Sequence, residues 1–128
     1  FSKEFTINVE RPGKAGAEEI QKMMADFRAN PPKDLGGSKV VLWKDYKTLE
    51  ATDDKGNKTS LDMPETSNVL QWFCDDDTKV SVRPSGTEPK IKFYIEVKGT
   101  MQDASEYETL DKNGVEKIEA IKRSLRLS

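Results

Sequence analysis

An arginine, two hydroxyl side chains and a glycine lie close together in the segment 83–90, which reads RPSGTEPK. The Arg83 guanidinium offers a planar fork of N–H donors that matches the geometry of phosphate oxygens. Ser85 and Thr87 add hydroxyl donors, and Gly86 lets backbone N–H groups approach a ligand closely. This combination predicts a binding site for an anion such as phosphate.

The segment is stiffened and framed by its neighbours. Pro84 and Pro89 fix their own backbone and push the preceding residues toward extended conformations, so the loop loses little entropy when it closes on a ligand. Residues 79–82 before the loop and 90–98 after it alternate polar and apolar side chains. A period of two is typical of strands with one buried face. The sequence therefore predicts a rigid hairpin with the loop at its tip.

The other charged residues of the hairpin allow more than one interpretation. Lys90 is predicted to be a peripheral phosphate contact, and Lys92, on the polar side of the strand, ranks below it. A carboxylate repels a bound phosphate, so Glu88 is not assigned to the ligand and is expected to hold the loop through an ion pair. The structural alternative is an ion pair between Arg83 and either Asp77 or Glu88.

Apolar residues with the spacing of an amphipathic helix occur in two segments. Apolar residues recur at i, i+3, i+4 and i+7 within residues 15–29, which predicts an amphipathic helix there. A second stripe lies near the end of the chain, at Val115, Ile118, Ile121 and Leu125. Asp103 and Glu106 before it have the spacing of an N-capping pair. The Asn-Gly pair at residues 113–114 is expected either to interrupt this helix or to mark its start.

Short β-forming runs separate the two helices, and turn residues separate the runs. Strands are predicted at 5–9, 39–43, 69–74, 79–82 and 90–98, with a hairpin tip or loop at 53–57. The order strand, helix, strands, helix predicts an α+β fold: a mostly antiparallel sheet of four to five strands with two helices on one face.

Composition narrows the functional classes. The 128 residues carry a net charge of −2, which argues against nucleic-acid or membrane-surface binding. The chain contains no histidine, so imidazole catalysis and histidine metal ligation are excluded within it. Cys74 is the only cysteine, which favours a reducing cytoplasm. Its thiol is expected to be buried and inert. The run of three aspartates at 75–77 is interpreted as a solvated turn, and no metal site is predicted.

The loop and the strand after it, residues 83–94, resemble the C-terminal phosphate-binding loop of the α-D-phosphohexomutases, which include phosphoglucomutases, phosphomannomutases and phosphoglucosamine mutases. The resemblance implies that residues 1–128 form the last of four domains of such an enzyme, with the three preceding domains absent. A start at Phe1 fits that expectation. The implied fold is a sheet covered by two helices, similar to the TATA-binding protein. Arg83, Ser85, Gly86 and Thr87 match the family's anchor for the phosphate that is not being transferred.

The resemblance also implies what the parent enzyme does. It would act as an intramolecular phosphotransferase that interconverts hexose 1-phosphate and hexose 6-phosphate through a bisphosphorylated intermediate. The phosphoserine, the sugar-reading loop and the aspartates that hold Mg²⁺ would lie outside this chain. We therefore expect no catalytic residue and no metal ligand here, and we expect the isolated chain to be inactive. The implied partners are a phosphosugar and the other domains of the same polypeptide.

Three alternatives remain open from the sequence. Within the family, the parent could be a phosphoglucosamine mutase, although residues 90–94 look more like the phosphoglucomutase/phosphomannomutase branch. Outside the family, the chain could be a stand-alone anion- or nucleotide-binding module. A third reading is a purely structural or interaction domain that carries a turn between two prolines.

Overall fold

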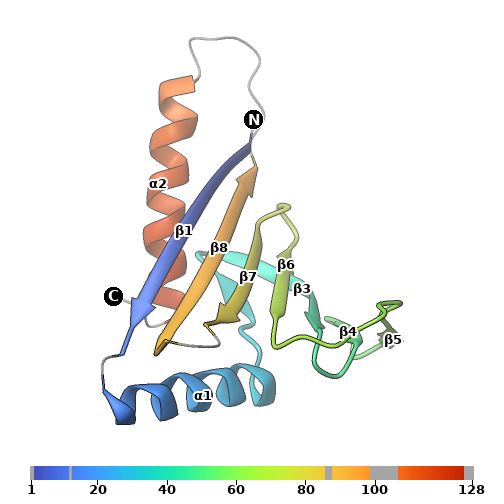
Figure 1. Ribbon diagram of the computed structural model, residues 1–128. Helices are drawn as coiled ribbons and strands as arrows, with labels where there is room; N and C mark the ends of the chain where they lie inside the picture. Colours follow the sequence, from blue (N-terminus) through green and yellow to red (C-terminus); the bar gives the residue numbers. More distant parts are fainter. Residues whose placement is uncertain (1, 12, 86–87, 99–106, 126–128) are drawn as a thin grey trace.

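The structure, a computed structural model, describes residues 2–11, 13–85, 88–98 and 107–125. Within these residues the chain forms eight strands and two helices (Figure 1). In chain order they are β1 Ser2–Glu10, α1 Lys14–Ala29, β2 Asp34–Leu35, β3 Ser38–Asp45, β4 Glu50–Asp53, β5 Lys58–Ser60, β6 Leu70–Cys74, β7 Lys79–Pro84, β8 Lys90–Lys98 and α2 Tyr107–Ser124.

The strands form one open antiparallel sheet in the order β1-β8-β7-β6-β3-β4-β5, with the short β2 paired to β3. The predicted α+β class, antiparallel sheet and two helices are confirmed. The sheet has more strands than the expected four to five, because the predicted tip at 53–57 is flanked by a paired hairpin, β4–β5. The two-residue β2 was also not predicted from the sequence.

One face of the sheet carries the core. Apolar side chains of β6, β7 and β8 meet those of both helices there in a single cluster, which includes Trp72, Phe93, Met24 and Ile121. Trp72 is only 1% exposed, and the Phe27 ring meets it edge-on with a centroid separation of 5.0 Å. Figure 1 is seen from the opposite, open face, with β1 crossing in front of α2 and α1 lying across the lower ends of the strands.

Both helices run close to where the sequence predicted them. Helix α1 begins one residue before the predicted range, and Ile20 and Met24 are its buried apolar residues. Helix α2 continues through residues 113–114, so the expectation that Asn-Gly interrupts or starts this helix is wrong. The proposed capping pair, Asp103 and Glu106, lies outside the described residues.

A polar anchor fixes α2 to the sheet. Lys117 of α2 is 18% exposed, and its Nζ donates to the carbonyl oxygen of Gly36 at 3.0 Å and to the Ser38 hydroxyl. The same ammonium forms an ion pair with Asp76 at 3.3 Å. Asp76 also accepts a hydrogen bond from Ser38 at 2.5 Å. The turn at residues 75–77 was expected to be merely solvated, but its middle residue, Asp76, holds α2 through Lys117.

The contacts of Asp76 should make the stability of the fold depend on pH in the acid range. Burial acts to raise the pKa of Asp76, but hydrogen bonds from Ser38 and Thr78 and the charge of Lys117 outweigh it and lower the pKa from 3.8 to about 2. A lowered carboxyl pKa stabilises the fold above pH 3.8, and this contribution is lost as pH falls toward 2. Because solvent screens the half-exposed carboxylate, we expect Asp76 to contribute only about 1 kcal/mol to the free energy of unfolding.

Urea unfolding at pH 6 and pH 2 tests this expectation. The stability difference between the unmodified chain and Asp76→Asn should shrink at the lower pH. Asp77→Asn is the matched control, because Asp77 has a φ of 68° and asparagine also tolerates this left-handed backbone. An Asp76→Asn effect that is the same at both pH values would contradict the prediction.

Candidate functional site

The predicted anion-binding loop joins the neighbouring strands β7 and β8 at the end of the sheet beside α1 (Figure 1). Pro84 pairs with Ile91 at the end of the ladder. The Ser85 N–H then donates to the Lys90 carbonyl at 2.9 Å, and the Lys90 N–H donates to the Glu88 carbonyl at 2.8 Å. The loop therefore begins and ends at fixed backbone positions. Gly86 and Thr87, two of the predicted ligand contacts, lie outside the described residues.

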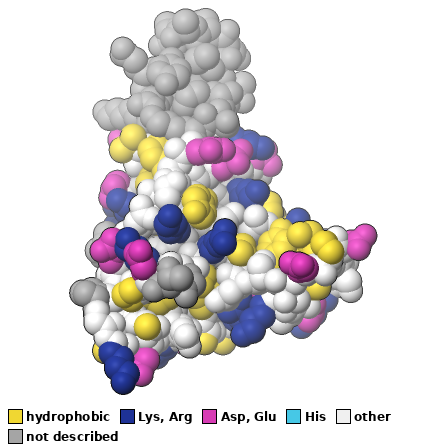
Figure 2. Space-filling view, in the orientation of Figure 1, with side chains coloured by type: hydrophobic (Ala, Val, Ile, Leu, Met, Phe, Trp, Pro, Cys, Tyr) yellow, Lys and Arg dark blue, Asp and Glu magenta, His cyan; other side chains and the backbone are white. Residues whose placement is uncertain are grey.

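Arg83 lies on the open face of the sheet. Its neighbour Val82 and the strand partner of Val82, Phe93, are both fully buried in the core. Because side chains alternate along a strand, Arg83 projects to the other face, where it is exposed. Figure 2 shows Lys and Arg side chains on this face.

The structural alternative for Arg83 required an ion pair with Asp77 or Glu88. Within the described part of the chain, Arg83 forms no such pair, and Glu88 instead contacts Lys90. The guanidinium donors thus have no carboxylate partner among those residues. This arrangement leaves Arg83 available for an anion, and its role as a ligand stays a prediction.

Lys90 is engaged within the protein. Its Nζ lies 2.7 Å from the Glu88 carboxylate and 3.4 Å from that of Glu10 on β1. The hydrogen bond to Glu88, followed by that to Glu10, raises the pKa of Lys90, while the bond to Lys90 lowers the pKa of Glu88. Glu88 therefore holds the loop through an ion pair, as expected. The predicted phosphate contact by Lys90 would have to compete with two carboxylates.

Lys92 is the second cation that the structure brings to Arg83. The two residues pair directly across β7 and β8, and both are exposed on the open face. Among the described residues, Lys92 forms no ion pair, in contrast to Lys90. From the sequence, Lys90 ranked above Lys92 as a phosphate contact, and that ranking stays a prediction. The cross-strand register adds that residue 92 lies opposite residue 83.

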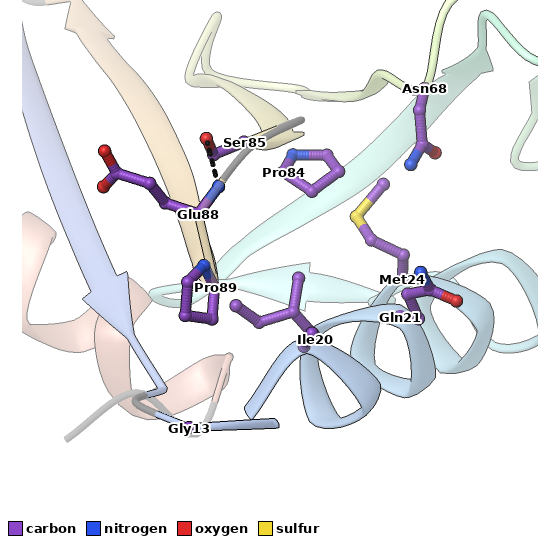
Figure 3. A pocket seen from close by; sticks show the side chains of 10 residues that line it. Gly13, Ile20, Gln21, Met24, Asn68, Pro84, Ser85, Glu88 and Pro89 are labelled. Carbon is purple, nitrogen blue, oxygen red and sulfur yellow. Dashed lines mark hydrogen bonds between the residues drawn. The ribbon is translucent and has the colours of Figure 1, made fainter. Parts of the chain in front are cut away.

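Ser85 lies where the loop meets α1. It is partly buried, and its hydroxyl oxygen accepts a long hydrogen bond of 3.4 Å from the Glu88 N–H. The hydroxyl hydrogen remains able to donate elsewhere. Ser85 also lines a cavity of about 410 Å³ between the loop and α1, shown in Figure 3.

The loop is bonded to the β1–α1 connection as well. The Arg11 N–H donates to the Pro89 carbonyl at 2.8 Å. The next turn is closed by a hydrogen bond from the Gly16 N–H to the Gly13 carbonyl at 3.1 Å. Backbone hydrogen bonds therefore link the end of the loop to the segment that leads into α1.

Cys74 and the acidic side chains are the other groups that could carry chemistry. Cys74 is 5% exposed, and burial, followed by the charge of Asp76, raises the pKa of its thiol to about 11. The thiol therefore stays protonated, as predicted for an inert cysteine. In the described ranges, no three Cys, Asp or Glu side chains gather to hold a metal ion. Neither described helix has the length and apolar character that crossing a membrane requires.

Comparison with known proteins gives a family match. The sequence matches the family model described as "Phosphoglucomutase/phosphomannomutase, C-terminal domain" over residues 7–112. A phosphoglucomutase of Staphylococcus aureus strain MRSA252 is 41% identical over 87 residues, which cover 67% of this chain and 15% of that protein. The phosphoglucomutase of strain MSSA476 is 40% identical over 87 residues, with the same coverage of 67% and 15%.

The chain spans about 15% of the length of the curated relatives that it matches. Among solved structures, the solution structure of Chr148 from Cytophaga hutchinsonii covers 98% of this chain and 94% of its own, with a TM-score of 0.30 and 12% identity.

Proposed function

The chain belongs to the phosphoglucomutase/phosphomannomutase family as a C-terminal domain, and from this premise we propose that its 83–90 loop anchors the phosphate of a phosphosugar. The single observation that supports this most is the pair Arg83 and Lys92. These two cations face each other across neighbouring strands, and both are exposed and form no ion pair among the described residues. Two adjacent cations beside hydroxyl and backbone donors suit a dianion.

The proposed anchor does not take part in bond making. It holds the phosphate that is not being transferred and so orients the reacting oxygen at the other end of the sugar. Binding energy from such a remote group can be used at the reacting centre, so weakening it lowers kcat as well as raising KM. The backbone bonds that close the loop at Ser85 and Lys90 support this role, because a rigid anchor fixes position better than a mobile one.

The activity of the whole enzyme is part of the same proposal. We propose that it interconverts hexose 1-phosphate and hexose 6-phosphate through a bisphosphorylated intermediate, in the cytoplasm. The Mg²⁺ implied by the family resemblance would be held by parts of the enzyme outside this chain. The named relatives are phosphoglucomutases, which supports the glucose branch.

The chain should bind inorganic phosphate weakly. Each charge-assisted hydrogen bond contributes about 1.5–3 kcal/mol, but an open site and the entropy of association offset much of this gain. We therefore expect a Kd in the millimolar range, roughly −4 kcal/mol. Amide NMR shifts during a phosphate titration should centre on residues 83–92.

Two variants test whether the phosphate shifts depend on Arg83. Arg83→Ala should abolish the shifts, whereas Arg123→Ala, at an exposed arginine of α2, should leave them unchanged. Equal phosphate binding by Arg83→Ala and the unmodified chain would contradict the proposed anchor.

The isolated chain should not convert glucose 1-phosphate to glucose 6-phosphate. An anchor positions a phosphate, but it supplies neither the group that donates phosphate nor the metal that assists transfer. A coupled assay of the purified chain, with a full-length mutase as the positive control, measures this directly. Turnover that stays with the chain through repeated purification would show that catalytic groups lie within it.

A further inference from the structure

The two edge strands of the sheet differ in length. One edge is β5, which has only three residues, all of them exposed. The other edge is β1, which pairs with β8 along all nine of its residues. Among the strands that the structure describes, none lies on the outer side of β1. A long strand at such an edge can pair with a strand of another chain.

Backbone hydrogen bonds show which groups of β1 point outward. The Arg11 N–H donates to the Pro89 carbonyl at 2.8 Å, which continues the register of the β1–β8 ladder. Along an antiparallel strand every second residue bonds the same neighbour, so the odd-numbered residues of β1 bond β8. The backbone groups that point away from β8 belong to Glu4, Thr6 and Asn8. Within the described part of the chain, no hydrogen bond reaches these groups.

A second copy of β1 complements this edge. When two β1 strands run antiparallel with Thr6 opposite Thr6, Glu4 of each copy faces Asn8 of the other. Phe5 then faces Ile7, and both of these partly buried side chains stay on the core side of the sheet. This register opposes no like charges in the middle of the strand, whereas a shift toward its end would align two glutamates. The middle of β1 is therefore self-complementary in charge and in polarity.

Helix α2 exposes an apolar side chain beside the same edge. Lys117 projects from one flank of α2 toward Gly36, in the turn between β2 and β3. A helix turns about 100° per residue, so Val115 lies on the opposite flank, which faces the β1 end of the sheet. Val115 is 45% exposed. In Figure 1, β1 crosses in front of α2, and part of α2 lies beyond the outer side of β1.

We propose that β1 is a docking edge for a second copy of this chain, and that the two copies pair antiparallel around Thr6 into one continuous sheet. The Thr6 pair and the two pairs of Glu4 with Asn8 each exchange two backbone hydrogen bonds. Arg83 and Lys92 lie on β7 and β8, so this edge is separate from the phosphate anchor. So short an interface must offset the entropy of association, and we expect half of the chain to be dimeric at about 0.1–1 mM.

Sedimentation equilibrium of the chain measures this self-association. The weight-average mass should rise above the monomer mass of 14.5 kDa as the concentration enters that range, and it should approach twice this value above it.

Disulfide trapping locates the interface. Two residues that exchange backbone hydrogen bonds lie about 5.5 Å apart between their Cα atoms, within the range of about 4.4–6.8 Å for a disulfide. Oxidised Thr6→Cys should therefore form a covalent dimer, while the buried Cys74 stays free. Asn8→Cys is the control on the same strand, because its two thiols would lie roughly 14 Å apart. Thr59→Cys, exposed on β5, is the control at the other edge.

Charge variants test the register. Thr6→Lys places two ammonium groups opposite each other and should weaken the dimer about five-fold. Asn8→Glu should weaken it too, because the new carboxylate faces Glu4 of the second copy, whereas within one copy it lies opposite Lys92. Glu4→Lys combined with Asn8→Glu should restore the dimer, since opposite charges then face each other. Thr59→Lys should leave self-association unchanged.

Each outcome bears on the proposal. A chain that stays monomeric throughout this concentration range would overturn it. Thr6→Cys that cross-links no better than Asn8→Cys and Thr59→Cys would also overturn it, since that pattern marks random collision. A dimer that Thr6→Lys leaves intact uses another surface, and a double variant that does not restore the dimer contradicts the register. If Thr6→Lys unfolds, Asn8→Glu and the double variant decide.

Discussion

Arg83→Lys should lower kcat/KM about 10- to 100-fold in a phosphohexomutase that contains this domain. Lysine keeps the positive charge but loses the bidentate fork and its fixed plane. Losing one charge-assisted hydrogen bond from the transition state costs about 1–3 kcal/mol, which gives this range of rates. Steady-state kinetics with glucose 1-phosphate measure the effect, and kcat should fall together with kcat/KM.

Folding should hardly change in this variant, because Arg83 is exposed and, within the described part of the chain, has no carboxylate partner. Thermal melting of the same preparation provides that control. The opposite pattern, with normal kinetics and a lowered Tm, would make Arg83 a structural residue. Lys92→Ala in the same assay should show a smaller loss than Arg83→Lys, since a lysine offers no planar fork to the phosphate.

Gly16→Ala should destabilise the chain strongly. A Cβ at Gly16 would lie 1.7 Å from the Arg11 carbonyl oxygen, which is backbone and has little room to move. Overpacking of this kind costs about 3 kcal/mol, and the turn must open to relieve it. Because the Arg11 N–H holds Pro89, the opened turn should also loosen the phosphate loop.

Chemical unfolding measures the loss of stability, and amide shifts at residues 88–92 report the loosened loop. Gly56→Ala is the control, because Gly56 has a φ of 86° but nothing within 4 Å of an added Cβ. Its cost should be only about 1 kcal/mol from backbone strain. Equal effects of the two substitutions would show that the close approach to Arg11 is relieved at little cost.

The elements that the sequence predicted well are those with a local signal. The apolar stripe of α1 and the alternation along β8 each repeat over several residues, so periodicity alone located them. The loop between β7 and β8 was predicted from local features as well, because its prolines restrict the backbone and its glycine permits a turn. Glu88 could be assigned to an ion pair because a carboxylate beside a phosphate is unfavourable by simple electrostatics.

The features that were missed depend on partners distant in the chain. Lys90 and Lys92 are both lysines on the polar side of one strand, and pairing to β1 and β7 gives each of them a different neighbour across the sheet. Glu10 of β1 neutralises Lys90, whereas Arg83 of β7 lies opposite Lys92. The role of Asp76 likewise requires Lys117 from the last helix. No window of neighbouring residues contains this information.

The placement of β1 next to β8 has a consequence for how the chain folds. The first strand pairs with the last, from Ser2 with Lys98 to Glu10 with Lys90, whereas β7 and β8 pair as a local hairpin. Loop-closure entropy slows contacts between distant segments, so the β7–β8 hairpin should form early and β1 should join late. During synthesis, β1 leaves the ribosome long before its partner exists. The hairpin that carries the phosphate loop therefore acquires its final neighbour in the last step of assembly.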